Sequence, residues 1–66
     1  MTKSEAKRKY GVEFGKLTTS KDSVGEYTLY ENGRVVAEGW FDSAAEIKAE
    51  YIGLQIGARI VDDEEA

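Results

Sequence analysis

The sequence predicts a small α+β domain in which one α-helix packs across one face of a three-stranded antiparallel sheet. Three observations support this prediction: a β-hairpin signal at residues 26–41, an alternating apolar segment at residues 10–15, and a helix-capping sequence at residues 43–46. Their order along the chain gives the topology β-β-β-α. A short fourth strand at residues 58–61 is an alternative end to the domain.

The N-terminal arm, defined as residues 1–9, is predicted to be flexible and basic. It could form a short helix capped by Ser4, but Ala6 is its one apolar residue between positions 2 and 9, so nothing would hold such a helix against the domain. From Tyr10 the pattern changes, because Tyr10, Val12 and Phe14 alternate with glycine or glutamate. This period of two predicts the first strand, followed by a polar connection at residues 18–25.

The hairpin is predicted from Asn32-Gly33, which lies between two β-prone segments. A two-residue type I′ turn needs positive φ at both central positions, and Asn and Gly supply it at the lowest cost. A regular ladder from this turn gives a definite register. The predicted pairs are Glu31 with Arg34, Tyr30 with Val35, Leu29 with Val36, and Tyr27 with Glu38.

A helix is predicted to begin after Ser43, because Ser43 and Glu46 have the spacing of a capping box. It is expected to end at Gly57 or, as an alternative, at Gly53, with glycine in the left-handed region. The domain then spans residues 10–61. The acidic run at residues 62–66 is predicted to be a disordered tail.

Two apolar stripes run along this helix at about 100° per residue. The core stripe consists of Ala44, Ile47, Tyr51, Leu54 and Ala58, and the second stripe consists of Ala45, Ala49, Ile52 and Ile56. A helix that only covers a sheet needs one apolar face, so the second stripe must contact something else. The candidates are a wrapped N-terminal arm, a second copy in a homodimer, or another protein; the alternative is that a small domain buries most of its helix.

The aromatic residues suggest a second contact surface. The predicted register places Trp40 on one sheet face with Tyr27, Leu29 and Val36, and Phe41 on the other with Tyr30, Val35 and Ala37. One helix covers only one of these faces. Because Trp and Tyr are over-represented at interface hot spots, Trp40 and Tyr27 are candidate partner-binding residues, unless their face is the core.

A basic cluster in the arm is the candidate for nucleic-acid binding. Lys7, Arg8 and Lys9 could contact phosphates while Tyr10 stacks on a base. Charge along the whole chain disfavours this interpretation: residues 1–21 have a net charge of +4, but residues 22–66 contain three basic and eleven acidic residues, a net charge of −8. An acidic body repels phosphate backbones.

Residues 27–51, with a tight Asn-Gly hairpin followed by an aromatic residue and a capped, Glu-rich helix, resemble the arm-binding N-terminal domains of tyrosine-type phage integrases. The resemblance implies DNA binding by a sheet face rich in Lys and Arg. This hairpin departs from that pattern, because it has Arg34 alone against Glu26, Glu31 and Glu38.

Composition limits the function further. The 66-residue chain has no cysteine and no histidine, so acid–base catalysis would need a carboxyl, amine or phenol with a strongly shifted pKa in a deep pocket. We therefore expect no enzyme activity, no cofactor and no metal ion. Apolar runs of two or three residues predict no membrane segment, and we expect a cytoplasmic location.

The expected function is a small acidic protein-binding module of the kind that phages and mobile elements use as accessory or inhibitor proteins, acting by charge mimicry. The alternative is a small nucleic-acid-binding regulator.

Overall fold

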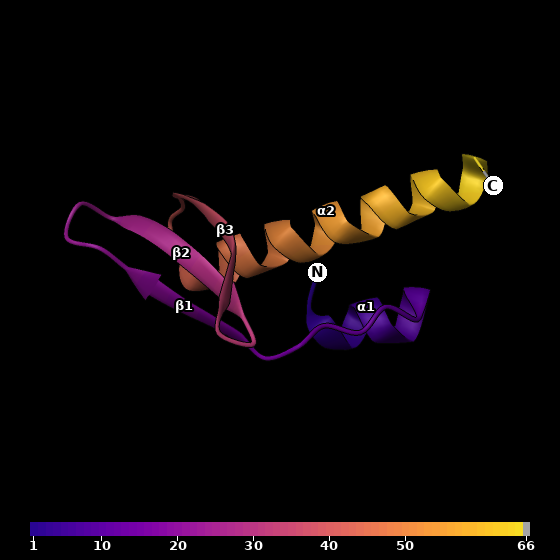
Figure 1. Ribbon diagram of the computed structural model, residues 1–66, viewed down its shortest axis with the longest axis horizontal. Coiled ribbons are helices and arrows are strands. Elements are labelled where there is room, and N and C mark those ends of the chain that lie inside the picture. Colours follow the sequence, from indigo (N-terminus) through magenta and orange to yellow (C-terminus); the bar gives the residue numbers. More distant parts are fainter. Residues whose placement is uncertain (66) are drawn as a thin grey trace.

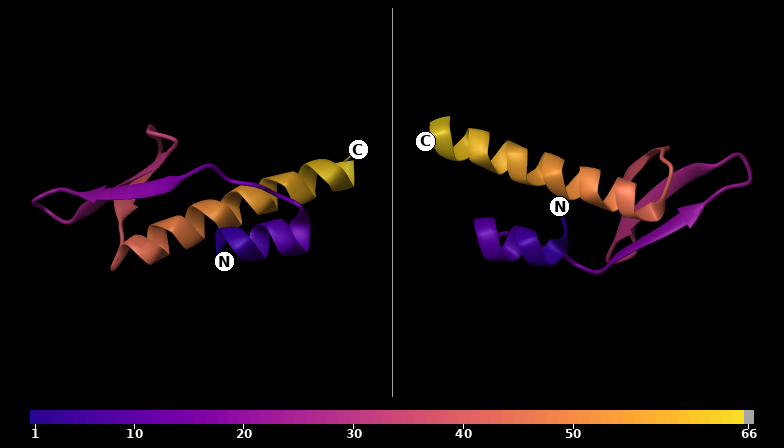
Figure 2. Two further views of the ribbon diagram at one scale, coloured as in Figure 1. Left: turned by 90° about the horizontal axis from the view of Figure 1, so that it is seen from below. Right: turned by 180° about the vertical axis from the view of Figure 1, so that it is seen from behind.

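A computed structural model describes the backbone of residues 1–65 and the side chains of residues 1–58. The elements follow in the order α1 (Lys3–Tyr10), β1 (Leu17–Lys21), β2 (Glu26–Glu31), β3 (Arg34–Trp40) and α2 (Ala44–Glu65). The molecule is elongated, with extents of 43 × 20 × 20 Å. The sheet lies at one end, and α2 extends away from it alongside α1 (Figures 1 and 2).

The three strands form an antiparallel sheet in the order β1-β2-β3. Both central residues of the β2–β3 turn have positive φ, 53° at Asn32 and 83° at Gly33, which confirms the predicted type I′ turn. The two pairs nearest the turn, Glu31 with Arg34 and Tyr30 with Val35, are also confirmed. The α+β class and the three-stranded sheet are thus as predicted.

The predicted register is wrong beyond these two pairs. A β-bulge between Leu29 and Tyr30 shifts the ladder by one residue, so that Leu29 pairs with Ala37 and Tyr27 pairs with Gly39. Because side chains alternate across a strand, a shift of one residue moves every later side chain of β3 to the opposite sheet face.

The first strand begins later than predicted. Residues 11–16 are irregular, and β1 occupies residues 17–21, of which 18–21 belong to the predicted polar connection. The rest of that connection is a tight turn, in which the Asp22 Oδ1 atom accepts hydrogen bonds from the Val24 and Glu26 amides at 3.0 and 2.9 Å. Asp and Gly are the usual residues of such turns, and Gly25 has a positive φ of 94°.

Most of the N-terminal arm forms helix α1, which packs against α2. Thr2, and not Ser4, caps α1 by accepting a hydrogen bond from the Glu5 amide at 3.2 Å. Gly11 ends the helix in the left-handed region with φ of 68°. The expectation that nothing holds this helix is wrong, because Ala6 is fully buried against Val12, Ile52 and Ile56.

Helix α2 begins as predicted and continues further. The Glu46 amide donates to Ser43 Oγ at 3.3 Å, and Glu46 Oε2 in turn accepts from the Asp42 amide at 3.1 Å. The helix does not end at Gly53 or Gly57, and no C-terminal strand forms among the described residues, because residues 58–61 lie within α2. The helical backbone also includes the acidic residues 62–65, for which we predicted a disordered tail; Ala66 lies outside the described residues.

The apolar core has two parts along α2. Where α2 packs on β2 and β3, Leu29 and Ile47 are buried. Further along, Ile52 and Ile56 join Ala6 and Val12 in a second cluster, bordered by Phe14, Leu17 and Tyr51. Leu54 is 65% exposed, so its assignment to the core stripe is wrong.

The Glu31 carboxylate joins three parts of the molecule. Its Oε2 atom accepts from the Gly15 amide at 2.8 Å, and its Oε1 atom accepts from the Tyr51 hydroxyl at 2.9 Å. Asn32 adds two bonds to Lys16, one to its amide and one to its carbonyl, both at 2.9 Å. A Cβ atom at Gly15 would overlap the side-chain amide of Asn32, so any other residue there would push this amide away from its hydrogen bond to Lys16.

The helical glycines provide a first prediction. Gly53 lies in the interior of α2, and no neighbouring atom would contact a Cβ there. We expect Gly53→Ala to raise the free energy of unfolding by about 0.5–1 kcal/mol, as measured by urea denaturation. Gly33→Ala is the matched control at positive φ and should lower that energy by ~1 kcal/mol or more. A Gly33→Ala variant as stable as the wild type would contradict the type I′ turn.

The Tyr51 hydroxyl provides a second prediction. Burial, followed by the hydrogen bond to Glu31 and its charge, raises the pKa of Tyr51 above its ordinary value of 10.0, and Arg34 opposes the shift. A raised folded-state pKa contributes stability that is complete below pH 10 and is lost as the pH rises through the folded-state pKa. We therefore expect the free energy of unfolding to fall above about pH 10.

Denaturation at pH 8 and at pH 11 measures this effect. The loss between the two pH values should be smaller in Tyr51→Phe, which removes the titrating group. Tyr10→Phe, a change at an exposed tyrosine, is the control and should behave like the wild type. An equal loss in the wild type and in Tyr51→Phe would show that the Glu31 contact makes no pH-dependent contribution.

Candidate functional site

The sheet has one face against α2 and one face without a covering element. We call the uncovered face the open face. Because side chains alternate along each strand, the register shows which residues of each strand lie on it. The hydroxyls of Ser20 and Tyr30 on it are 3.2 Å apart. The open face contains Thr18, Ser20, Glu26, Thr28, Tyr30, Val35, Glu38 and Trp40.

Trp40 is the largest exposed apolar side chain of the described residues, with 65% of its surface accessible. It pairs across the strands with Glu26 and follows Glu38 by two positions on the same face. Its ring lies near Gly25, 3.8 Å from the position that a Cβ would take there. Trp40 thus shares the open face with two neighbouring glutamates, Glu26 and Glu38.

Tyr27 does not share this face with Trp40. Tyr27 lies with Leu29 on the face toward α2, and the Lys21 ammonium lies 5.5 Å from the Tyr27 ring centre. The bulge moves Trp40 to the opposite face, where it pairs with Glu26. The pairing of Tyr27 and Trp40 in one contact surface is therefore wrong, and Trp40 alone remains from that prediction.

The open face is acidic. Its charged strand residues are Glu26 and Glu38, and none of the strand residues assigned to it is Lys or Arg. Arg34 pairs with Glu31 and so belongs to the other face. The basic sheet face that the resemblance to integrase arm-binding domains implies is thus absent from the described strands.

The second stripe of α2 divides into two parts. Ile52 and Ile56 are only 2% and 4% exposed, because α1 and Val12 cover them. The wrapped N-terminal arm is therefore the partner of this half of the stripe, and neither isoleucine is accessible for a homodimer contact. Ala45 is exposed and Ala49 is half-buried.

These two alanines line a groove of about 610 Å³ between α2, the start of α1 and the start of β1. Its apolar floor includes Leu17 and Ile52. Three lysines from three separate segments of the chain, Lys3, Lys16 and Lys48, are among its lining residues, and we call it the lysine groove. Its lining residues are Met1, Thr2, Lys3, Ser4, Lys16, Leu17, Ala45, Lys48, Ala49 and Ile52.

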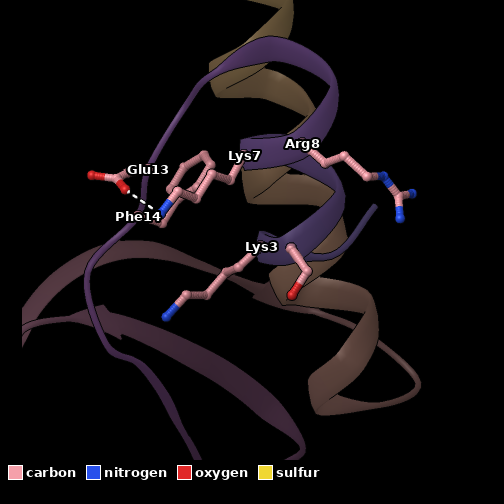
Figure 3. Close-up of a pocket in the computed structure, with 6 residues that line it drawn as sticks. Lys3, Lys7, Arg8, Glu13 and Phe14 are labelled. Atoms are coloured by element: carbon pink, nitrogen blue, oxygen red, sulfur yellow. Dashed lines mark ion pairs between the residues drawn. The ribbon is translucent and has the colours of Figure 1, made fainter.

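The members of the basic cluster of α1 differ in their surroundings. Lys7 pairs with Glu13 at 2.8 Å, and this hydrogen bond and charge raise the pKa of Lys7 and lower the pKa of Glu13. Figure 3 shows Lys7 turned toward Glu13 and Arg8 pointing the opposite way, around a hollow of about 750 Å³. Lys9 and Tyr10 are exposed.

Two other features are absent from the described residues. No group of three or more Asp, Glu, His or Cys side chains there has an arrangement that could hold a metal ion. None of the helices in that part of the chain combines the length and the apolar character needed to cross a bilayer.

Comparisons with known proteins give no functional assignment. No protein-family model matches this sequence, and no significant match was found among curated proteins or solved structures.

Sequence reasoning did not find the lysine groove. Lys3, Lys16 and Lys48 are far apart in the sequence, and they approach one another only because α1 folds back onto α2. The one signal in the sequence that could have indicated the groove was the second apolar stripe, because it had no assigned contact and includes Ala45 and Ala49.

The burial of the second stripe leads to a third prediction. Ile52→Lys would place an unpaired charge in the core and should lower the free energy of unfolding by ~3 kcal/mol or more, out of roughly 5 kcal/mol for a small domain. Leu54→Lys, two positions away and exposed, should change it by less than about 0.5 kcal/mol. Thermal melts followed by circular dichroism measure both. A folded Ile52→Lys variant with an unchanged midpoint would contradict the packing of α1 on α2.

Proposed function

We propose that this protein is a non-enzymatic protein-binding module whose contact surface is the open face and whose partner presents a basic segment. The observation that carries the proposal is Trp40, 65% exposed and paired with Glu26 on a sheet face without a cation among its strand residues. Exposed tryptophan is among the residues most enriched at interface hot spots.

The chemistry of this face suits a guanidinium or ammonium group. Cations are attracted to the face of an indole ring, and arginine also stacks on it. Glu26 and Glu38 can accept charge-assisted hydrogen bonds from the same group. Val35, 49% exposed at the other end of the face, adds apolar area.

An acidic surface of this kind can also occupy the nucleic-acid-binding groove of a partner. The protein would then act as an inhibitor by charge mimicry, because its carboxylates compete with phosphates for the same basic residues. Charge complementarity mainly increases the association rate of the complex, and the contact made by Trp40 would lower its dissociation rate.

A peptide titration tests the proposal. Trp40 is the only tryptophan, so its emission reports directly on binding of a nona-arginine peptide to the open face. We expect a saturable change that weakens with added salt, and no change with nona-glutamate. By calorimetry, Trp40→Ala should weaken binding by about 30-fold, the effect of ~2 kcal/mol at a hot spot.

Matched variants separate the open face from the general acidity of the chain. Glu26→Gln with Glu38→Gln should weaken peptide binding, whereas Glu46→Gln with Glu50→Gln, on α2, removes the same charge and should have little effect. Equal effects of the two pairs would reject the open face as the contact surface. Sub-micromolar binding of duplex DNA that is lost on combined Lys7→Glu, Arg8→Glu and Lys9→Glu would favour the nucleic-acid alternative.

A further inference from the structure

The lysine groove has the properties of a small-molecule site. Its volume of about 610 Å³ lies within the range of roughly 300–1,000 Å³ that is typical of ligand pockets. Apolar side chains of Leu17, Ala45, Ala49 and Ile52 line it, and a few polar groups surround them. This combination of an apolar floor and a few convergent polar groups is the usual composition of a binding site.

The charges around the groove all have one sign. Lys3, Lys16 and Lys48 line it, and no Asp or Glu does. Among the side chains of residues 1–58, the one ion pair joins Lys7 and Glu13, so none of these three lysines has a described carboxylate within ion-pair distance. Lys3 Nζ donates to the Gly15 carbonyl at 2.9 Å, which uses one of its three donors.

We propose that the lysine groove binds a small anionic amphiphile, namely a medium-chain carboxylate whose apolar chain lies on the alanine and leucine floor and whose head group is bound by the lysines that line the groove. Charge complementarity selects an anion, and the apolar floor selects a chain. The size of the groove fits a small molecule better than a folded partner. The site is independent of the proposed function, because none of its residues belongs to the open face.

Decanoate is the probe, added below its micelle concentration to ¹⁵N-labelled protein and followed by amide chemical shifts. We expect saturable shifts that include the amides of Leu17, Ala45 and Ala49. Decanoate should bind more tightly than octanoate, by up to ~fourfold for each added methylene group. Decyltrimethylammonium has the same chain with the opposite charge and should bind at least tenfold more weakly.

Variants with equal changes in net charge test the lysines. Lys16→Gln with Lys48→Gln should reduce decanoate affinity at least tenfold, whereas Lys9→Gln with Lys21→Gln, outside the groove, should leave it within about twofold. Ala45→Trp should fill the floor and abolish binding. The dispersion of the amide spectrum shows whether each variant remains folded, and the lysine variants alone decide the question if Ala45→Trp does not fold.

Three results would overturn the proposal. The first is equal binding of decanoate and decyltrimethylammonium, which would mean that the lysines do not contribute. The second is equal weakening by the two lysine pairs, which would mean that only net charge matters. The third is a shift of the same amides by the acidic peptide of residues 58–66 and not by decanoate, which would make the groove a docking site for a second copy of the chain.

Discussion

The Glu31 carboxylate is the interaction on which the arrangement of the other elements depends. Its two oxygens bind the Gly15 amide and the Tyr51 hydroxyl, so that one side chain at the end of β2 holds both the segment before β1 and the middle of α2. Hydrogen bonds to a charged acceptor contribute more than those between neutral groups. Phe14, with its ring 5.8 Å from that of Tyr51 in an edge-on arrangement, packs beside this contact. Residues 11–16 are thus fixed at both ends, by the Gly11 cap and by Glu31, and this places α1 against α2.

The elements that could be predicted from the sequence depend on short-range chemistry. The Asn32-Gly33 turn and the Ser43 cap each require particular residues at fixed spacing, and both are confirmed. The first strand could not be placed, because the alternation of Val12 and Phe14 has a different cause. These residues turn inward in an irregular segment that runs back along the helices, whereas β1 consists mostly of polar residues. Gly53 and Gly57 did not end α2, because glycine permits a helix end without requiring one.

The candidate site was predictable only in part, and for a similar reason. The exposure of Trp40 follows from a sheet that has only one covering helix. Its cross-strand neighbour on the open face, however, depends on a bulge that no local signal in β3 indicates. Because of that bulge, Trp40 shares its face with Glu26 and not with Tyr27, and the surface is acidic. The second stripe correctly indicated that α2 needs a second contact. Its isoleucines are covered by α1 of the same chain, while Ala45 and Ala49 remain beside the lysine groove, and a long-range contact of this kind leaves no periodic pattern.

The uneven distribution of charge along the sequence corresponds to two surfaces of opposite charge in the structure. Carboxylates occupy the open face, and lysines from the first half of the chain contribute to the groove. The molecule is 43 Å long and 20 Å wide, and both dimensions exceed the screening length of about 8 Å at physiological salt. A ligand close to one surface therefore responds to the charges of that surface, and the net charge of −4 is a poor guide to what binds there. This is why an acidic protein can offer a site for an anion, and why the proposed basic partner and the proposed carboxylate need not compete.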